Sequence, residues 1–582
     1  MQPPRLPQVR QIASAPTSTM SELPPFEALN FDASFESGNL GEVKLISEVP
    51  LEYDLHIQPD TLNARHRVWF FFSVSNARRN QKVIFNIIGY SKTKSLFRDG
   101  MAPVVSSSRR PYWERMPQAA VYYYRSPRHD RQYVLSFPFC FERPDETYYF
   151  AYSYPYTYSY LQRYLHSLDI KNLTYYRREC LCRTVQNRRL DLITISSPAN
   201  LARDAAVHME PVGSTATSGV PCRPVFVFSA RVHPGESPAS LVMHGLLAFL
   251  TSAHPKAIAL RERVIFKVVP MLNPDGVFLG NYRCNSLGLD LNRLWHTPVE
   301  AIAPTIHTVR DMLLLYSKHP TCRLNLFVDI HAHSTCMNGF VFANVPEDPK
   351  DLDAVAAFPR ALANHSPTFA FSGTKYCADP SKAGTGRRAL AEMLPRVHCY
   401  TLEVSFFCSA QGNVRGEAYT PTSYTDMGQS MGMALHEYYS GLDISTRGEH
   451  HKDSLPATTK AVKDQPLYAL QHPTQGTLQG HTSLADTRQH SRRLCRTPLT
   501  NGVLDTAAAP AVLRAGSTGT VDSAGDAGAG LASSGEEASC GLYRGRDAHT
   551  VGPPTNSRGS SRSSVHQKLH SRRTLASRER ST

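Results

Sequence analysis

Residues 229–236 read Ser-Ala-Arg-Val-His-Pro-Gly-Glu, and this stretch indicates both the fold class and the chemistry. The apolar run at 224–228 before it is typical of a buried strand, and residues 239–250 after it have the pattern of a helix. The turn between them carries His233 and Glu236, whose imidazole nitrogen and carboxylate oxygen are ligands that zinc takes in catalytic sites. His-x-x-Glu alone is a weak signal, because most such pairs lie in ordinary surface turns.

Two further apolar runs follow, and the second leads into candidate ligands. Residues 264–269 precede Asn-Pro-Asp-Gly at 273–276, whose residues form tight turns. Residues 324–328 precede His331 and His333. In open α/β sheets the crevice lies at the carboxyl ends of parallel strands, so ligands far apart in sequence converge there. We therefore expect His331, or alternatively His333, to join the first pair as the third ligand.

An ordered set of motifs carries a family resemblance. The motifs are His-Pro-Gly-Glu (233–236), Asn-Pro-Asp-Gly (273–276), Asn-Tyr-Arg-Cys (281–284), Asp-Leu-Asn-Arg (290–293), Asp-Ile-His-Ala-His-Ser (329–334) and Tyr-Thr-Leu-Glu-Val-Ser-Phe (400–406). As a set they resemble the zinc metallocarboxypeptidases. Among these the resemblance is to the cytosolic carboxypeptidases, which trim glutamates from protein C-termini and from polyglutamate side chains. It extends over about residues 31–442.

The resemblance implies a site that holds one Zn²⁺ ion. His233, Glu236 and His331 would be the ligands, and zinc would lower the pKa of a water molecule toward ~7. Glu403 would act as general base and acid, and Arg283 would polarise the scissile carbonyl and stabilise the oxyanion. Glu403 also stands out by itself, because a carboxylate at the end of an apolar core run needs a partner or a task.

The same resemblance implies residues that bind the end of a peptide. Asn292 and Arg293 would bind the terminal α-carboxylate, because a planar guanidinium fits a carboxylate bidentately and only a chain end offers that anion. Arg387 or Arg388 would meet the terminal side chain, and Lys382 is a secondary candidate. A cation at this position favours glutamate over apolar side chains.

Two positions depart from the digestive carboxypeptidases. Gly235 stands where those enzymes have an arginine between the His and Glu ligands, so we expect one substrate contact to be missing. Ser381 stands at the spacing of their mobile tyrosine, with Tyr376 somewhat earlier, and we assign no catalytic tyrosine. Neither departure affects the zinc ligands or the base, so an active enzyme is expected.

The composition of the 582-residue chain predicts four segments. Residues 1–28 are rich in Pro, Ser and Gln, lack the apolar core of a signal peptide, and are expected to be disordered. Residues 29–165 should form an N-terminal β-sandwich domain, and residues 166–442 the zinc carboxypeptidase catalytic domain. Residues 443–582 are rich in Ser, Gly and Arg and should be a disordered basic tail.

The two folded segments differ in the pattern of their apolar residues. In the first, short aromatic and β-branched runs at 68–74, 83–88 and 133–139 are separated by polar turns, which is typical of a sandwich. The tyrosine-rich stretch at 150–160 fits either internal packing or a binding surface. In the second, apolar strands alternate with helices, which predicts an α/β fold with a mixed, largely parallel sheet.

The formal net charge of +14 favours an acidic partner. A polyglutamate chain is attracted to a cationic surface, whereas specific nucleic-acid binding is not expected because the sequence carries none of its signatures. No apolar run reaches the roughly 18 residues of a membrane span. The cysteines are scattered without a Cys-x-x-Cys pair, which fits a reduced cytosolic protein, and we expect a monomer.

The leading hypothesis is therefore a zinc-dependent carboxypeptidase that removes glutamates from protein ends and polyglutamate side chains. The resemblance implies tubulin as a substrate, shortening of long glutamate chains, and action in the cytosol, at microtubules, centrioles or basal bodies. Two alternatives stay open: a deacylase-type zinc amidohydrolase for N-acyl amino acids, and a non-catalytic binding protein on the same fold. The expected sandwich and the Asp-Leu-Asn-Arg motif disfavour the first, and the complete set of ligands and base disfavours the second.

Overall fold

The structure, a computed structural model, describes residues 28–207, 222–411 and 415–447. The segments expected to be disordered, 1–28 and 443–582, lie outside these residues except for Ala28 and the short stretch 443–447, which continues a helix. Within the described residues, a region built of strands is followed by a region in which helices and strands alternate.

The N-terminal region is a sandwich of two five-stranded sheets, as predicted. The strand orders are β1-β4-β10-β6-β7 and β2-β3-β5-β9-β8. Aromatic side chains meet between the sheets: the ring centroid of Phe85 lies 6.1 Å from that of Phe72 and 5.4 Å from that of Phe150. The strands are β1 (Asn30–Asp32), β2 (Val43–Glu48), β3 (Leu51–His56), β4 (Phe71–Ser75), β5 (Gln81–Ile88), β6 (Val104–Ser107), β7 (Glu114–Arg115), β8 (Tyr122–Arg125), β9 (Tyr133–Phe141) and β10 (Tyr148–Ala151).

The tyrosine-rich stretch serves mainly as internal packing, the first of the two predicted alternatives. The ring of buried Tyr152 lies 5.3 Å from that of Phe406 in the second region. The buried Tyr154 donates its hydroxyl to the backbone oxygen of Tyr419 at 3.1 Å. Only toward its end does the stretch reach the surface, where Tyr160 is 42% exposed in helix α1 (Tyr158–Asp169). These contacts fix the sandwich against the second region.

The second region contains an eight-stranded mixed sheet, which confirms the predicted α/β class. Its strand order is β11-β12-β14-β13-β15-β18-β16-β17. The central strands β14, β13, β15 and β18 are parallel to one another, whereas β11, β12 and β16 pair antiparallel with their neighbours toward the middle. The strands are β11 (Tyr176–Arg183), β12 (Arg189–Ile195), β13 (Arg223–Ala230), β14 (Ile265–Val269), β15 (Cys322–His333), β16 (Gly339–Ala343), β17 (Lys375–Tyr376) and β18 (His398–Ser405).

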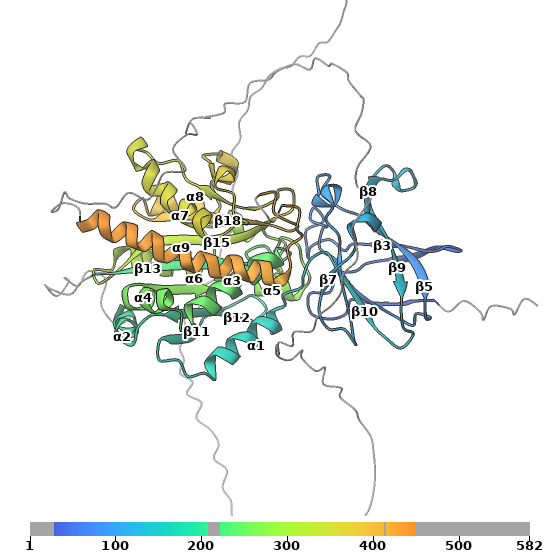
Figure 1. Cartoon of the computed structure of the whole chain (residues 1–582), viewed down its shortest axis with the longest axis horizontal. Helices are drawn as coiled ribbons and strands as arrows, with labels where there is room; N and C mark the ends of the chain where they lie inside the picture. The colour runs from blue at the N-terminus through green and yellow to red at the C-terminus, as the bar shows by residue number, and fades with distance from the viewer. Residues whose placement is uncertain (1–27, 208–221, 412–414, 448–582) are drawn as a thin grey trace, which may run out of the picture. The chain divides into compact units, whose positions relative to one another are not determined.

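Helices cover both faces of this sheet, which explains why its central strands are apolar without alternation. Phe226 and Phe228 of β13 belong to a core shared with α3, α4, α7 and α9, while Val225 and Val227 belong to a second core with α6 and α8. Figure 1 shows α9 running along α3 on one face. The helices are α2 (Pro198–Val207), α3 (Ser237–Leu250), α4 (Pro255–Arg263), α5 (Pro274–Phe278), α6 (Pro304–Lys318), α7 (Leu352–His365), α8 (Gly386–Met393) and α9 (Pro421–Arg447).

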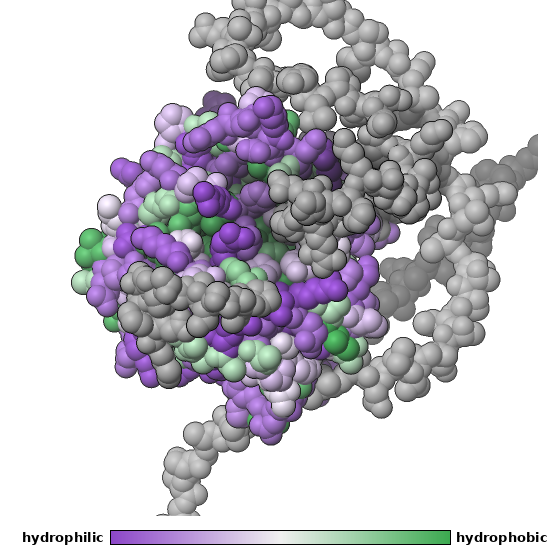
Figure 2. Space-filling view, turned by 90° about the vertical axis from the view of Figure 1, so that its left-hand side faces the viewer, coloured by the Kyte–Doolittle hydropathy of each residue, from purple (hydrophilic) through white to green (hydrophobic). Residues whose placement is uncertain are grey.

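The close approach of α3 and α9 depends on two glycines. A Cβ atom at Gly245 would lie 2.0 Å from the backbone oxygen of Thr425, and one at Gly428 would lie 2.0 Å from that of Val242. This pairing therefore anchors the helix that starts directly after the His-Pro-Gly-Glu turn. On the face drawn in Figure 2, hydrophilic residues predominate and hydrophobic ones form small groups between them. Among the described helices, none has the length and hydropathy that a membrane crossing requires.

Candidate active site

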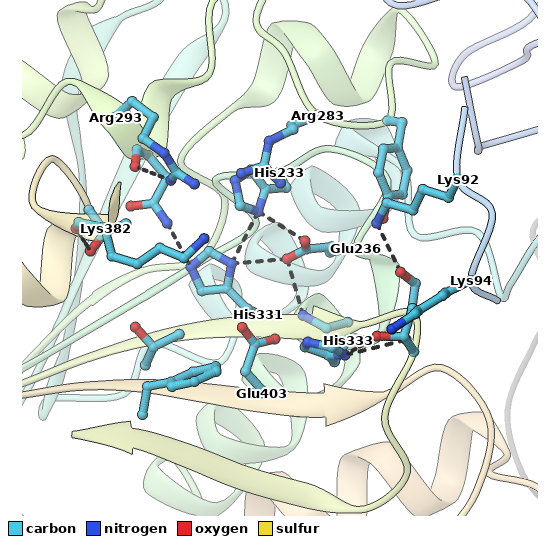
Figure 3. A pocket seen from close by; sticks show the side chains of 18 of the residues that line it. Lys92, Lys94, His233, Glu236, Arg283, Arg293, His331, His333, Lys382 and Glu403 are labelled. Atoms are coloured by element: carbon cyan, nitrogen blue, oxygen red, sulfur yellow. Dashed lines mark hydrogen bonds and ion pairs between the residues drawn. The ribbon is translucent and has the colours of Figure 1, made fainter. Parts of the chain in front are cut away.

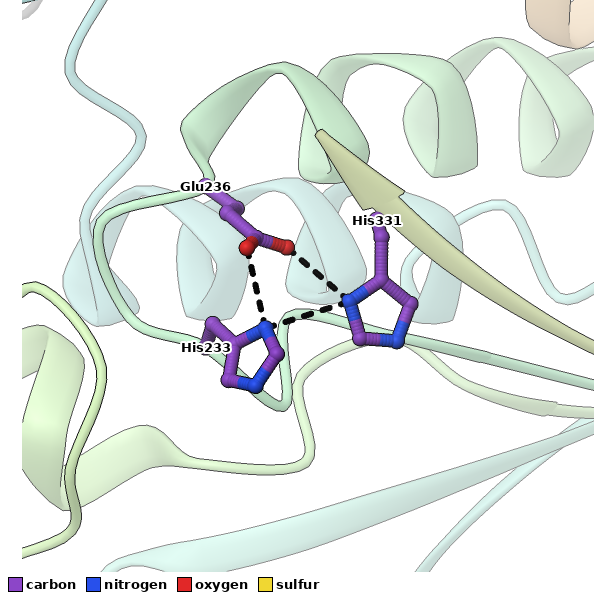
Figure 4. A group of neighbouring side chains, drawn as sticks. All are labelled: His233, Glu236 and His331. Atoms are coloured by element: carbon purple, nitrogen blue, oxygen red, sulfur yellow. Dashed lines mark hydrogen bonds and ion pairs between the residues drawn. The ribbon is translucent and has the colours of Figure 1, made fainter. Parts of the chain in front are cut away.

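Three predicted ligands lie together at the carboxyl end of the central strands. His233 and Glu236 come from the turn between β13 and α3, and His331 comes from β15. All three are buried, and one ligand atom from each lies within 4.8 Å of the others (Figure 4). The expectation that His331 follows its strand was wrong, because β15 continues to His333 through its pairing with β18.

The geometry points one ring nitrogen of each histidine toward a common centre. Nδ1 of His331 lies 3.2 Å from Nδ1 of His233 and 3.0 Å from Oε2 of Glu236, and Nδ1 of His233 lies 2.9 Å from Oε1 of Glu236. The opposite nitrogens face carboxylates: Nε2 of His331 is 2.7 Å from Asp329, and Nε2 of His233 is 3.3 Å from Asp290. Such partners fix the ring orientation of metal-binding histidines.

This arrangement fits a zinc ion. Two imidazoles and one carboxylate are a donor set of catalytic zinc, and they leave a further position open. Burial alone would raise the pKa of Glu236, but the charges of His233 and His331 hold it well below its usual range. Burial alone would lower the pKa of His331, but Asp329 and Glu236 raise it well above its usual value. The carboxylates thus favour positive charge at this buried centre.

Glu403 faces the same centre from the neighbouring strand. It lies within β18, rather than after a strand as predicted, and pairs in register with His331. Burial raises the pKa of Glu403 to about 8, and the charges of Glu236 and Asp329 act in the same direction. Its side chain lines the cavity in Figure 3, and no hydrogen bond to its carboxylate is found among the described residues. It is therefore available to exchange a proton with a bound molecule.

The residues predicted to contact the peptide carbonyl and terminal carboxylate also line the cavity. Arg283 donates through both Nε and Nη2 to Oδ2 of Asp290, at 2.7 Å each, so the same carboxyl group holds a candidate ligand and Arg283. Asn292 directs Nδ2 toward Nε2 of His331 at 3.5 Å and accepts from the backbone N–H of residue 386. Arg293 donates to the backbone oxygen of Asn292 at 2.8 Å.

The three candidates for recognising the terminal side chain lie in different environments. Arg387 lines the cavity but is only 3% exposed, and it donates to the backbone oxygens of Ala343 and Cys377 at 3.0 and 3.2 Å. Lys382 lines the cavity and is exposed, and Figure 3 shows its ammonium group near Arg293 and His331. Arg388 is not part of the cavity lining and donates to Cys377 as well, at 3.3 Å.

Four further positions considered in the sequence are placed by the structure. A Cβ atom at Gly235 would lie 2.5 Å from the ring of Tyr282, so no larger side chain fits there without a shift. His333, the alternative third ligand, lies outside the triad and lines the cavity, where burial lowers its pKa to about 4. Neither Tyr376 nor Ser381 belongs to the cavity lining.

The sequence did not indicate that the β-sandwich domain contributes to this site. Asp60, which is 2% exposed, accepts backbone N–H groups from Tyr282, Arg283 and Cys284 at 2.6, 2.7 and 2.8 Å. The loop that carries Arg283 is thus held by a carboxylate from the other domain. The cavity measures about 570 Å³, and its lining includes Ser91, Lys92, Thr93 and Lys94 of the sandwich domain.

Comparison with known proteins agrees with this fold and site. Residues 161–393 match the family model of zinc carboxypeptidases, and residues 31–153 match that of the cytosolic carboxypeptidase N-terminal domain. A metallo-carboxypeptidase structure from Burkholderia cenocepacia superposes with a TM-score of 0.57 at 22% identity, covering 72% of this chain and 100% of that one. The fold and the residues gathered at the cavity define a zinc carboxypeptidase, a hydrolase.

Relatives at higher identity narrow the assignment. Cytosolic carboxypeptidase 6 of Homo sapiens is 48% identical over 413 residues, which cover 71% of this chain and 78% of the relative. Cytosolic carboxypeptidase 6 of Caenorhabditis elegans is 41% identical, over 76% of this chain and 95% of the relative. The chain belongs to the cytosolic carboxypeptidase family.

Proposed function

We propose that this protein removes glutamates one at a time from the carboxyl ends of proteins and from polyglutamate side chains. The observation that supports the proposal is the charge of the cavity around His233, Glu236 and His331. Apart from this triad, Glu403 is the acidic residue of the cavity lining, and the other charged side chains of the lining are basic. These basic residues are Lys92, Lys94, Arg283, Arg293, Lys382 and Arg387. A substrate with several carboxylates matches this charge.

The metal ligands in this proposal are His233, Glu236 and His331, which would hold one Zn²⁺. When bound, zinc supplies Lewis acidity that polarises a carbonyl group and makes a water molecule a nucleophile near neutral pH. Asp290 and Asp329 keep the two histidine rings oriented with Nδ1 toward Glu236, so that both nitrogens would be available to hold the ion.

The proton transfers and the charge of the transition state are assigned to two residues. Glu403 accepts the proton of the attacking water and returns it to the leaving amine, a role suited to a carboxylate that no other described residue engages in a hydrogen bond. Arg283 donates to the oxygen on which negative charge develops, and Asp290 fixes its guanidinium for this purpose.

The carboxyl-terminal residue of the substrate is assigned to the side of the triad where Asn292 and Arg293 lie. Asn292 and Arg293 bind the terminal α-carboxylate, which restricts cleavage to a chain end. For the terminal side chain we propose Arg387 with Lys382. Arg387 keeps its guanidinium in place through backbone oxygens, whereas the exposed ammonium of Lys382 is free to approach a glutamate carboxylate. Arg388, which does not line the cavity, has no proposed contact.

The proposed substrates are glutamate-ending and polyglutamylated proteins, with tubulin first among them and long chains shortened in preference to removal of the branch-point residue. The proposed place of action is the cytosol, including microtubules, centrioles and basal bodies. This part of the proposal rests on the family relationship and on the names of the relatives, which are cytosolic carboxypeptidases.

A substrate panel tests the proposed activity. We expect the zinc-loaded protein to release free glutamate from a peptide ending in several glutamates, and to act at least about tenfold more slowly on the same peptide ending in alanine or phenylalanine. An N-acyl amino acid serves as the comparison for the deacylase alternative. Hydrolysis of the N-acyl amino acid without glutamate release would replace the proposal by that alternative.

A further inference from the structure

Two lysines of the sandwich domain line the cavity, although the chemistry proposed above uses neither. Lys92 and Lys94 lie in the loop that joins β5 to the short helix η1 (Leu96–Asp99). In Figure 3 the triad lies between Arg293 and Lys382 on one side and Lys92 and Lys94 on the other. The cavity therefore has cations on two opposite sides, which come from different domains.

The loop that carries these lysines is fixed to its surroundings. The hydroxyl of Tyr123 donates to the backbone oxygen of Lys92 at 2.8 Å. The N–H of Leu96 donates to the backbone oxygen of Ser334 at 3.2 Å, which ties the loop to the segment directly after His331 and His333. The two ammonium groups thus start from defined backbone positions beside the triad.

Among the described residues, the groups that hold the ammonium of Lys92 are neutral. Its Nζ donates to the hydroxyl of Tyr282 at 2.5 Å and to that of Ser334 at 2.9 Å, and it lies 4.6 Å from the centroid of the Tyr282 ring. Tyr282 precedes Arg283, so Lys92 contacts the same loop that carries Arg283. The half-buried Lys92 is therefore placed at the cavity, but its charge is not neutralised there.

Lys94 is exposed and extends toward His333 in Figure 3. Within the part of the chain that the structure describes, neither Lys94 nor Lys92 forms an ion pair with an acidic residue. The catalytic side of the cavity differs, because Arg283 is paired with Asp290. Uncompensated ammonium groups at a cavity raise the local concentration of anions and bind carboxylates that reach them.

We propose that Lys92 and Lys94 form a subsite for an acidic side chain upstream of the scissile bond. This inference rests on the proposed carboxypeptidase activity and adds to it. If the terminal residue occupies the side of Asn292 and Arg293, an extended peptide crosses the triad and leaves along Lys92 and Lys94. Each extended residue advances the chain by about 3.3–3.6 Å, so the one or two residues before the cut lie within reach of a lysine side chain. The sandwich domain then selects glutamate chains over single terminal glutamates.

Paired peptides measure this subsite directly. Each pair releases the same terminal glutamate and differs only in carrying glutamate or glutamine at the last or second-last position before it. For the wild-type full chain with zinc we expect kcat/KM to favour the acidic member by about tenfold, since each charge-assisted contact near a surface contributes a few-fold to tenfold. The ratio should fall toward unity as salt is raised.

Variants then assign the preference to the lysines. In Lys94→Gln the ratio should fall to about threefold, and in the double variant Lys92→Gln, Lys94→Gln it should approach unity. Lys94→Glu should prefer lysine over glutamate at the sensitive position, which a purely structural role for Lys94 would not produce. Lys82→Gln is the matched control, because exposed Lys82 lies near the opposite end of β5 and does not line the cavity.

The outcomes separate this subsite from the activity on which it rests. Glutamate release from both members of a pair at equal rates by the wild type would overturn the subsite alone. A preference for the acidic peptide that persists in the double variant would also overturn the subsite. The same holds if Lys82→Gln reduces this preference as much as the double variant does. Absence of glutamate release from every peptide would overturn both the subsite and the proposed function.

Discussion

The two sides of the cavity hold their charged groups in different ways. On the catalytic side, His233 and His331 each have a carboxylate behind the ring: the half-buried Asp290 and the buried Asp329 respectively. On the sandwich side, Lys92 is held by hydroxyl groups and by the face of an aromatic ring. The two histidines and Arg283, which are proposed to act in bond cleavage, are oriented by carboxylates, whereas Lys92, which is proposed to act in recognition, keeps its charge available for a partner.

Loss of a proposed metal ligand should give the largest effect. His331→Ala removes one imidazole and leaves Glu236 and Asp329 without their shared partner. We expect the purified variant to contain little zinc and to retain less than about one thousandth of the wild-type activity, because outer partners of metal ligands alone contribute about 10–100-fold. Metal analysis together with glutamate release checks this. Full zinc content in the variant would exclude His331 as a ligand.

The carboxylates behind the histidines should have a smaller effect than the ligands themselves. Asp290→Asn weakens the fixing of both His233 and Arg283, so zinc affinity should fall about 10–100-fold and kcat should fall with it. Zinc competition with a chelator measures the affinity. Asp191→Asn is the matched control. Asp191 is a buried acid that pairs with Arg178, and its strand β12 is separated from β15 by β14 and β13 in the sheet. Equal zinc affinities in Asp290→Asn and Asp191→Asn would contradict the idea that the carboxylate behind His233 fixes the catalytic side of the cavity.

The contact between the domains should have a smaller effect, expressed mainly in kcat. Asp60→Asn replaces one of the carboxylate oxygens that accept N–H groups from Tyr282, Arg283 and Cys284 with an amide donor. A lost buried hydrogen bond of this kind costs about 1–3 kcal/mol, and displacement of Arg283 should lower kcat about tenfold with little change in zinc content. Asp54→Asn, another buried acid of the sandwich, should leave kcat unchanged. A normal kcat for Asp60→Asn would show that the sandwich does not position Arg283.

A change in substrate selectivity, rather than in zinc content or kcat, should separate the neighbouring Arg387 and Arg388. Arg387→Gln should reduce the preference for terminal glutamate over glutamine about tenfold, because the variant lacks the cation proposed to meet the side chain. Arg388→Gln should change this preference by less than about twofold, since the residue does not line the cavity. Both substrates are followed in parallel for each variant. Glutamate release by Arg387→Gln at the normal rate and selectivity would remove Arg387 from this role.

The sequence predicted the features that apolar pattern and local motifs encode. Strands buried on both faces, such as β13 and β15, read as continuous apolar runs, and their carboxyl ends indicated where His233 and His331 would meet. Exact strand limits were harder: β4 begins at Phe71 although its apolar run begins at Val68, because apolar residues report burial and not backbone pairing.

The sequence could not predict how the sandwich domain contributes to the site. Asp60 accepts a hydrogen bond from the backbone N–H of Tyr282, which is 222 residues away in the sequence. A contact over such a distance leaves no pattern in the local sequence. Lys92 and Lys94 look like ordinary surface lysines, because their position at the cavity depends on how two domains pack. In contrast, Asp290 and Asp329 had a local signal, since each stands two positions before a predicted site residue, Asn292 and His331.

The most direct test compares wild-type protein with Glu403→Gln on a peptide that ends in several glutamates, after both have been shown to contain zinc. The account predicts steady glutamate release by the wild type and a loss of about 10²–10⁴-fold in the variant, the range that general acid–base catalysis contributes. Zinc-loaded wild type that releases no glutamate, or a variant that releases it at the wild-type rate, would contradict the account.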